Sequence, residues 1–143
     1  AGDPSTLSAS DNPSIQGGAY ATADDLAALV LMHLRDGKCG DQQVLSAEAI
    51  DLMTEDRIDR VYSGSNVDFF GKSWGYGMGW ATDRASGRTV NGGIWGGGTS
   101  LDRDAGFGFV LVLEATFLDG RALVVESTVF ADSIREAVTA ARG

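Results

Sequence analysis

The sequence predicts an α+β fold in which an antiparallel meander sheet is flanked by helices. Apolar residues recur at helical spacing in the first third of the chain and again near its C-terminus. Between them, short apolar runs alternate with Gly- and Asp-rich turns, which is the pattern of consecutive antiparallel strands. Helices, then strands, then a helix is an α+β order. The 143 residues suffice for one domain with a core.

The N-terminal part is predicted as coil followed by a capped helix. Residues 1–16 are polar and contain both prolines of the chain, which predicts coil. The folded part then covers residues 17–143. Thr22 and Asp25 have the spacing of a capping box, and the apolar spacing that follows predicts a helix over residues 22–36.

A second helix is predicted over residues 46–54, because Ser46 is a good N-cap and an apolar face follows it. Residues 57–72 show no steady period and contain two glycines, so they are predicted as a long loop. The remaining elements are four strands over 77–82, 88–95, 99–103 and 107–114, and a final helix over 128–141.

Charge and composition limit the classes of partner. The net charge is −9 at pH 7 with a pI near 4.3, and an anionic surface disfavours nucleic acid and anionic lipid. The apolar runs are too short for a membrane span. Cys39 is the only cysteine, so an internal disulfide is excluded and the cellular compartment stays undetermined.

Glycine is concentrated between residues 92 and 98, where five of seven residues are Gly. Glycine weakens a strand, so it persists there when the backbone must closely approach a ligand, a crossing strand or a reacting group. Two interpretations follow: a site of main-chain N–H donors of the oxyanion type, or a surface for close packing. Residue chemistry alone favours close packing.

Other chemistries are disfavoured by the residues present. No serine has the Gly-x-Ser-x-Gly frame, and neither lysine lies in a Ser-x-x-Lys motif. His33 and Cys39 are interpreted as a helix-face histidine and an incidental thiol, and a single His and Cys exclude zinc. Residues 102–106 fit a hairpin turn better than a calcium loop, and the glycine cluster lacks the helix of a phosphate loop. No metal or cofactor is predicted.

Four segments resemble, in order, the C-terminal half of the serine β-lactamase-like superfamily, which includes class C β-lactamases, penicillin-binding proteins and family VIII carboxylesterases. Residues 17–26 resemble its Gly-Gly…Asp-Leu helix start, and residues 45–53 resemble the next helix. Trp74-Gly-Tyr-Gly-Met-Gly-Trp80 is similar to its Tyr-Gly-x-Gly-Trp entry to the sheet. Asn91-Gly92-Gly93 lies where the superfamily has Lys-Thr-Gly, His-x-Gly or Trp-Gly-Gly. The resemblance implies that residues 17–143 are the C-terminal portion of such a domain.

The resemblance also implies an activity and a set of site residues. The activity is acyl transfer from a small ester or amide through a serine ester, with a nucleophile in a Ser-x-x-Lys motif that this chain lacks. The backbone N–H of Ile94 would be one oxyanion donor, and the neutral Asn91 favours esters over β-lactams. The other implied substrate-binding residues are Gly92, Gly93, Trp95, Trp74, Tyr76, Phe69 and Phe70, whose aromatic members suit an ordinary core equally well.

The last predicted strand has an expected partner. In that superfamily it pairs with a strand from the N-terminal portion, so here residues 107–113 form an apolar edge. We expect this edge to be covered by a missing N-terminal fragment, by a second copy of the chain, or by residues 1–16. A non-catalytic relic or interaction module that self-associates through this strand is the alternative function.

Overall fold

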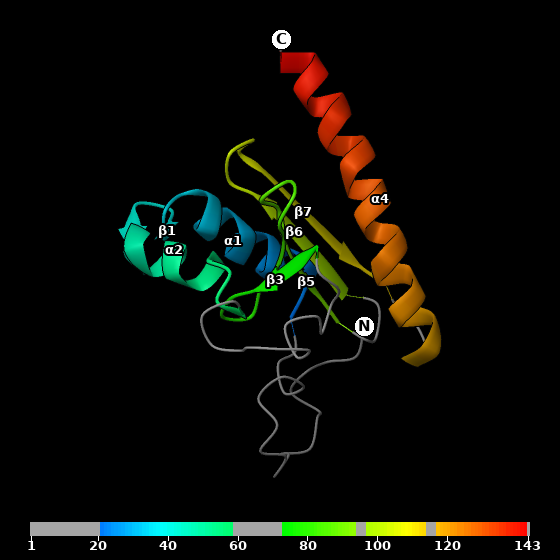
Figure 1. The fold of residues 1–143 in the computed structure, drawn as a ribbon. Helices are drawn as coiled ribbons and strands as arrows, with labels where there is room; N and C mark the ends of the chain where they lie inside the picture. The colour runs from blue at the N-terminus through cyan, green and yellow to red at the C-terminus, as the bar shows by residue number, and fades with distance from the viewer. Residues whose placement is uncertain (1–20, 59–72, 94–96, 114–116, 143) are drawn as a thin grey trace, which may run out of the picture.

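The computed structural model describes residues 21–58, 73–93, 97–113 and 117–142. Over these residues it is an α+β protein with three helices, a five-stranded antiparallel sheet and a two-stranded ribbon (Figure 1). The helices are α1 (Ala23–Leu34), α2 (Ala47–Thr54) and α4 (Phe117–Arg142), and the ribbon is β1 (Lys38–Cys39) with β2 (Gln42–Gln43). The sheet contains β3 (Trp74–Tyr76), β4 (Ala81–Asp83), β5 (Thr89–Gly92), β6 (Gly97–Asp102) and β7 (Phe107–Val112).

The start of α1 is fixed by the capping box that its sequence predicts. The Thr22 hydroxyl accepts a hydrogen bond from the Asp25 N–H at 3.2 Å, and the Asp25 carboxylate accepts one from the Thr22 N–H at 2.9 Å. The Thr22 hydroxyl also donates to the Asp25 carboxylate at 2.7 Å, and the bonds that the Thr22 N–H and hydroxyl donate hold the pKa of Asp25 below its ordinary value. Helix α2 begins in the same way, with the Ser46 hydroxyl accepting from the Ala49 N–H at 3.2 Å.

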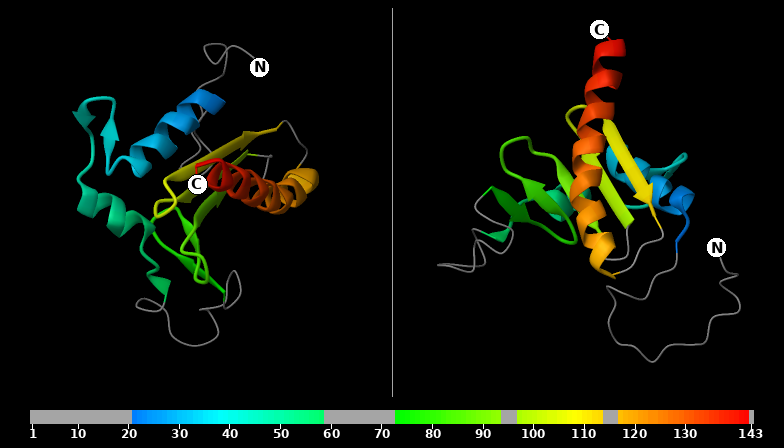
Figure 2. Two further views of the ribbon diagram at one scale, coloured as in Figure 1. Left: turned by 90° about the horizontal axis from the view of Figure 1, so that it is seen from above. Right: turned by 90° about the vertical axis from the view of Figure 1, so that its right-hand side faces the viewer.

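The five strands follow one another in space in the order of the sequence, each antiparallel to the next. Consecutive residues of β7 contact different helices, since a Cβ placed on Gly108 would meet Val30 of α1, whereas Phe109 packs edge-on against Phe130 of α4. Helices α1 and α4 therefore cover opposite faces of the sheet, as Figure 2 shows. The core on the α1 face contains Val30, Trp80 and Leu101, with Leu34, Met53 and Val110 packed around them.

Several element boundaries differ from those expected. The strand expected over 77–82 begins only at Ala81, as β4, because Gly77 and Trp80 close the hairpin turn between β3 and β4. The Gly77 N–H donates to the Trp80 carbonyl at 2.7 Å, and Gly79 has a φ of +84°, which favours glycine. The final helix begins at Phe117 rather than at residue 128. The ribbon of β1 and β2 was not expected at all.

Candidate functional site

The candidate-site residues that the structure describes at the end of β5 are Asn91 and Gly92, followed by Gly93, and all three are exposed. Strand β5 pairs with β6 along its whole length, from Thr89 to Gly92. It pairs with β4 only through its first two residues, Thr89 and Val90. The C-terminal end of β5 therefore runs past the start of β4 and faces the β3–β4 turn.

Backbone pairing determines which groups are presented at this end of β5. The Gly93 N–H donates to the Gly97 carbonyl at 2.6 Å, so residue 93 directs its hydrogen-bonding groups towards β6. Antiparallel strands alternate between hydrogen-bonded and non-hydrogen-bonded pairs. The N–H and C=O of Gly92 therefore point the other way, towards the side where β4 has already ended.

The side chain of Asn91 ties this end of β5 to the neighbouring turn. Its Nδ2 donates to the Gly79 carbonyl at 2.5 Å, across the position that a longer β4 would occupy. The Thr99 hydroxyl donates to the Asn91 carbonyl at 3.2 Å. These two hydrogen bonds hold Asn91 in place beside the outward-facing Gly92.

The glycines of the sheet differ in the space around them. A Cβ on Gly75 would lie 2.1 Å from the Asp56 carboxylate carbon, and one on Gly77 would lie 2.3 Å from the Met53 carbonyl oxygen. By contrast, a Cβ on Gly97 would meet no described atom within 4 Å, and on Gly93 the nearest is at 3.6 Å. Close packing therefore accounts for Gly75 and Gly77, whereas Gly93 and Gly97 have room for a side chain among the described residues.

Trp74 and Tyr76 lie on the opposite face of the sheet from Asn91. Tyr76 is paired with Ala81, and Ala81 with Val90, so these side chains share one face, and the next residue, Asn91, points to the other. The structure thus does not bring the two aromatic rings and the Asn91 side chain together as walls of one pocket. The other proposed site residues, Ile94, Trp95, Phe69 and Phe70, lie outside the described residues.

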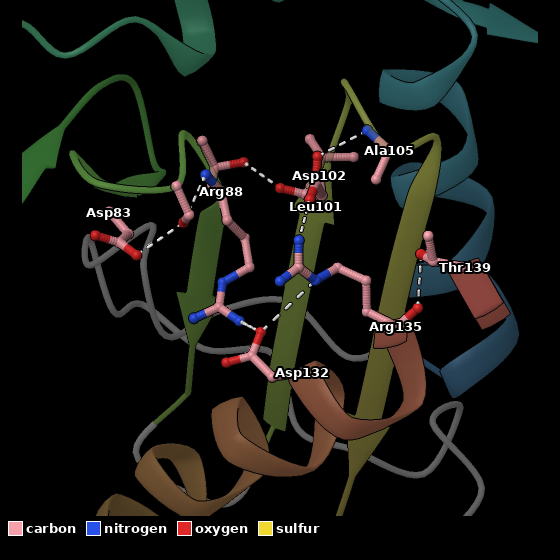
Figure 3. Close-up of polar contacts among 10 residues, drawn as sticks. Asp83, Arg88, Leu101, Asp102, Ala105, Asp132, Arg135 and Thr139 are labelled. Carbon is pink, nitrogen blue, oxygen red and sulfur yellow. Dashed lines mark hydrogen bonds and ion pairs between the residues drawn. The ribbon is translucent and has the colours of Figure 1, made fainter. Parts of the chain in front are cut away.

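A partly buried ionic network between the sheet and α4 was not foreseen. Arg88, just before β5, and Asp102, at the end of β6, are 8% and 6% exposed. Arg88 Nη1 pairs with Asp132 of α4, and Arg135 Nη1 lies 3.1 Å from Asp102 Oδ2, as Figure 3 shows. The only sequence signal was the spacing of Asp132 and Arg135, three residues apart on one helix.

The network is electrically balanced, since two guanidinium groups face two carboxylates. The Nε atoms of Arg88 and Arg135 and the hydroxyl of Ser100 are buried, and they have no hydrogen-bond partner among the described residues. Arg135 Nε lies 3.9 Å from Asp132 Oδ1, which is beyond hydrogen-bond distance. Because its charges cancel, the network serves to fix α4 on the sheet and needs no ionic ligand.

The two remaining polar candidates from the sequence are His33 and Cys39. His33 is buried edge-on against Trp80, with ring centroids 5.0 Å apart, and its Nδ1 donates to the Leu29 carbonyl at 2.9 Å. Cys39 is exposed on β1. Across the described ranges, no three His, Cys, Asp or Glu side chains are grouped to hold a metal ion. The described helices include none with the length and apolar character needed to cross a bilayer.

Comparison of the sequence with models of protein families and with curated proteins gives no match.

Proposed function

We propose that this chain provides the substrate-binding edge of a serine hydrolase with the β-lactamase/esterase fold, acting on a small ester or amide. The nucleophile, in a Ser-x-x-Lys motif, would belong to another part of the protein or to another polypeptide. The observation that carries the proposal is the end of β5, where Gly92 directs its backbone groups away from β6, beyond the start of β4. An exposed backbone edge of this kind is suited to hold a substrate by main-chain hydrogen bonds.

The chemistry of the proposed reaction uses this edge at one step. A serine hydroxyl attacks the acyl carbonyl, and the negative charge that forms on its oxygen is stabilised by backbone N–H donors. By the resemblance, one donor is the N–H of Ile94, two residues after Gly92. The open space around Gly93 and Gly97 supports the proposal, because bulkier side chains there would hinder a substrate from approaching the backbone.

A second candidate function is an interaction module without catalysis. The observation that favours it is the position of β7, which ends the described sheet and contains only apolar residues and glycine. Strands of this kind pair readily with another chain.

The test is the intact mass of everything that copurifies with the native gene product under non-denaturing conditions, followed by an ester hydrolysis assay. We expect a polypeptide or covalently continuous segment that carries Ser-x-x-Lys, and hydrolysis of a chromogenic ester that stops when this serine is replaced by alanine. Pure chain without such a segment, and without any effect of that serine, would contradict the hydrolase and favour the interaction module.

A further inference from the structure

His33 is the only histidine of the chain, and the proposed reaction gives it no role. It is 1% exposed, although its imidazole can bind a proton near neutral pH. The Nδ1 donates to the Leu29 carbonyl at 2.9 Å, whereas the buried Nε2 has no hydrogen-bond partner among the described residues. The neutral tautomer with its hydrogen on Nδ1 fits this arrangement, and Nε2 is then an acceptor with nothing to accept.

No charged group is placed to compensate a proton on Nε2. The β3–β4 turn and β7 contain no titratable residue, and the one on β6 is Asp102, which pairs with Arg135 of α4. Every titratable side chain of α1, α2 and β1 other than His33 is exposed. These side chains are those of Asp24, Asp25, Lys38, Cys39, Glu48 and Asp51.

The imidazole of His33 packs edge-on against the indole of Trp80. The ring centroids are 5.0 Å apart, and the ring planes meet at 69°. Trp80 is 4% exposed and belongs to the core of the α1 face, together with Val30 and Leu101. It also ends the β3–β4 turn, where its carbonyl accepts from the Gly77 N–H at 2.7 Å. The position of this turn against α1 therefore depends in part on the contact between the two rings.

The same turn is the neighbour of the candidate site. The carbonyl of Gly79, one residue before Trp80, accepts from Asn91 Nδ2 at 2.5 Å. The pairing of β4 with β5, continued past its last bonded residues, places Gly79 beside the outward groups of Gly92. A continuous series of contacts thus runs from the buried imidazole through Trp80 and Gly79 to Asn91.

We infer that His33 is a proton switch for this site. The neutral imidazole holds the β3–β4 turn, and with it the Asn91 hydrogen bond, in place. A proton from solvent that binds Nε2 adds a positive charge and a second N–H donor where no acceptor and no water is present, which costs folding free energy. Movement of Trp80 and its turn away from α1 exposes the imidazole to water and relieves this cost, and the Gly79 carbonyl then leaves Asn91.

The switch has a defined direction with pH. A histidine that is exposed to water binds a proton near pH 6.5, whereas the buried imidazole of His33 binds one only at the cost just described. Below about pH 6.5, the chain with a released turn therefore binds more protons than the chain with its turn in place. The form with the turn in place loses stability as the pH falls, by up to about tenfold in its ratio to the released form for each pH unit.

Urea unfolding between about pH 8 and pH 5, compared with two variants, tests the cost of the proton. His33→Phe keeps an aromatic ring against Trp80 but cannot bind a proton. The double variant with His33→Phe and Gln42→His moves the histidine to an exposed position on β2. We expect the folded-to-unfolded ratio of the unchanged chain to fall relative to both variants, by up to about tenfold per pH unit below about pH 6.5. Parallel profiles of the three proteins would overturn the inference.

Nuclear magnetic resonance of the unchanged chain tests the link to the site without any substitution. The signals of the His33 ring, the Trp80 indole and the Asn91 side-chain amide should change with one midpoint. The Ala105 N–H, which donates to Asp102 at 2.9 Å in the β6–β7 turn, should stay constant. A His33 titration that leaves Asn91 unchanged would overturn the link. Loss of all native signals at one pH would also overturn it, because the whole chain would then unfold.

The inference concerns regulation of the proposed site, and its consequence for catalysis rests on the proposed function. In the complex with a Ser-x-x-Lys segment, kcat/KM for an ester should fall below about pH 6.5 by up to about tenfold more per pH unit than with His33→Phe. Hydrolysis with the same pH profile in both would support the hydrolase and overturn the switch. The resonance changes in a chain that hydrolyses no ester in any complex would support the switch and contradict the proposed function.

Discussion

The carboxylate of Asp56 accepts a hydrogen bond from Arg84 Nε at 2.8 Å, and this ion pair joins the segment after α2 to the outer end of β4. The same carboxylate also accepts from the N–H groups of Ile58 and Tyr76, at 3.1 and 3.2 Å. A Cβ on residue 75 would lie 2.1 Å from the carboxylate carbon of Asp56. Only glycine at this position therefore leaves room for the carboxylate. One carboxylate thus connects α2 with the first hairpin of the sheet.

Replacement of Asp56 by Asn should destabilise the protein in a pH-dependent manner. Burial raises the pKa of Asp56, but hydrogen bonds from Arg84, Ile58 and Tyr76 and the charge of Arg84 together hold it below its ordinary value. A carboxyl group whose pKa is lower in the folded state stabilises the protein above its unfolded pKa of about 3.9, and this contribution is lost as the pH falls through the folded pKa.

We therefore expect Asp56→Asn to lower the free energy of unfolding by about 1–3 kcal/mol at pH 7, with a smaller difference from the unchanged protein below about pH 4. Urea unfolding followed by circular dichroism at several pH values measures this. Asp41→Asn, at an exposed position, is the control and should have little effect. An equal effect of Asp56→Asn at pH 7 and pH 3 would contradict the role of the charge.

Alanine at two glycines should have opposite effects on stability. A Cβ on Gly108 would lie 2.3 Å from Val30 Cγ1 and 3.2 Å from Leu34 Cδ1, so Gly108→Ala forces α1 to shift and should cost about 1–3 kcal/mol. Gly97 has space for a methyl group and no positive φ, so Gly97→Ala should stabilise by about 0.4–1 kcal/mol. Thermal melts of both variants measure the difference, and a stabilising Gly108→Ala would refute the packing of α1.

The partly buried ionic network predicts a clear cost for removing one arginine. Arg135→Met leaves the Asp102 side chain, 8% exposed, without its guanidinium partner, and should lower the free energy of unfolding by about 1–3 kcal/mol. Asp102→Asn in the same chain should recover part of this loss, because no buried charge then remains unpaired.

The matched control for Arg135→Met is Arg103→Met. Arg103 pairs with Asp36 and Asp51, whose side chains are 63% and 64% exposed, so its loss should cost about 1 kcal/mol or less. Chemical denaturation of the four proteins gives the comparison. Equal costs for the two arginine variants would show that burial of the network contributes little.

Asn91 allows a test of substrate charge. In the superfamily that the sequence resembles, Lys or His at this position favours anionic substrates, so Asn91→Lys should raise kcat/KM for a carboxylate-bearing β-lactam relative to a neutral ester. An added charge pair of about 1.4 kcal/mol corresponds to roughly a 10-fold change in this ratio. Gln42→Lys adds the same charge on β2 and should leave the ratio unchanged. The assay uses the complex with the Ser-x-x-Lys segment that the proposed function requires, and a ratio that moves equally in both variants would point to overall charge.

The sequence predicted the α+β class because its signals are local. A capping box, helical apolar spacing and turn residues between strands act over a few positions, and each is visible without tertiary contacts. The start of the last helix was missed because residues 117–127 contain Gly120 and β-branched residues, which disfavour a helix in isolation. The β1–β2 ribbon was missed because two-residue polar strands have no alternation to detect.

The site was less predictable than the fold because it depends on register. The glycine cluster marked the end of β5, but only the pairing shows that Gly92 faces outward and that Tyr76 lies on the other face. Likewise, Gly75 and Gly77 looked like part of a strand motif, whereas the end of α2 and the segment after it, packed against them, explain their size.

The contacts at the β3 border also decide where another strand can join the sheet. A sheet with two open borders can add copies at both ends and form filaments. Here Asp56 and Arg57 occupy the outward backbone groups of Tyr76, so a further strand cannot pair along this end of β3. Growth of the sheet from this side is thereby restricted without any charged side chain within β3 itself.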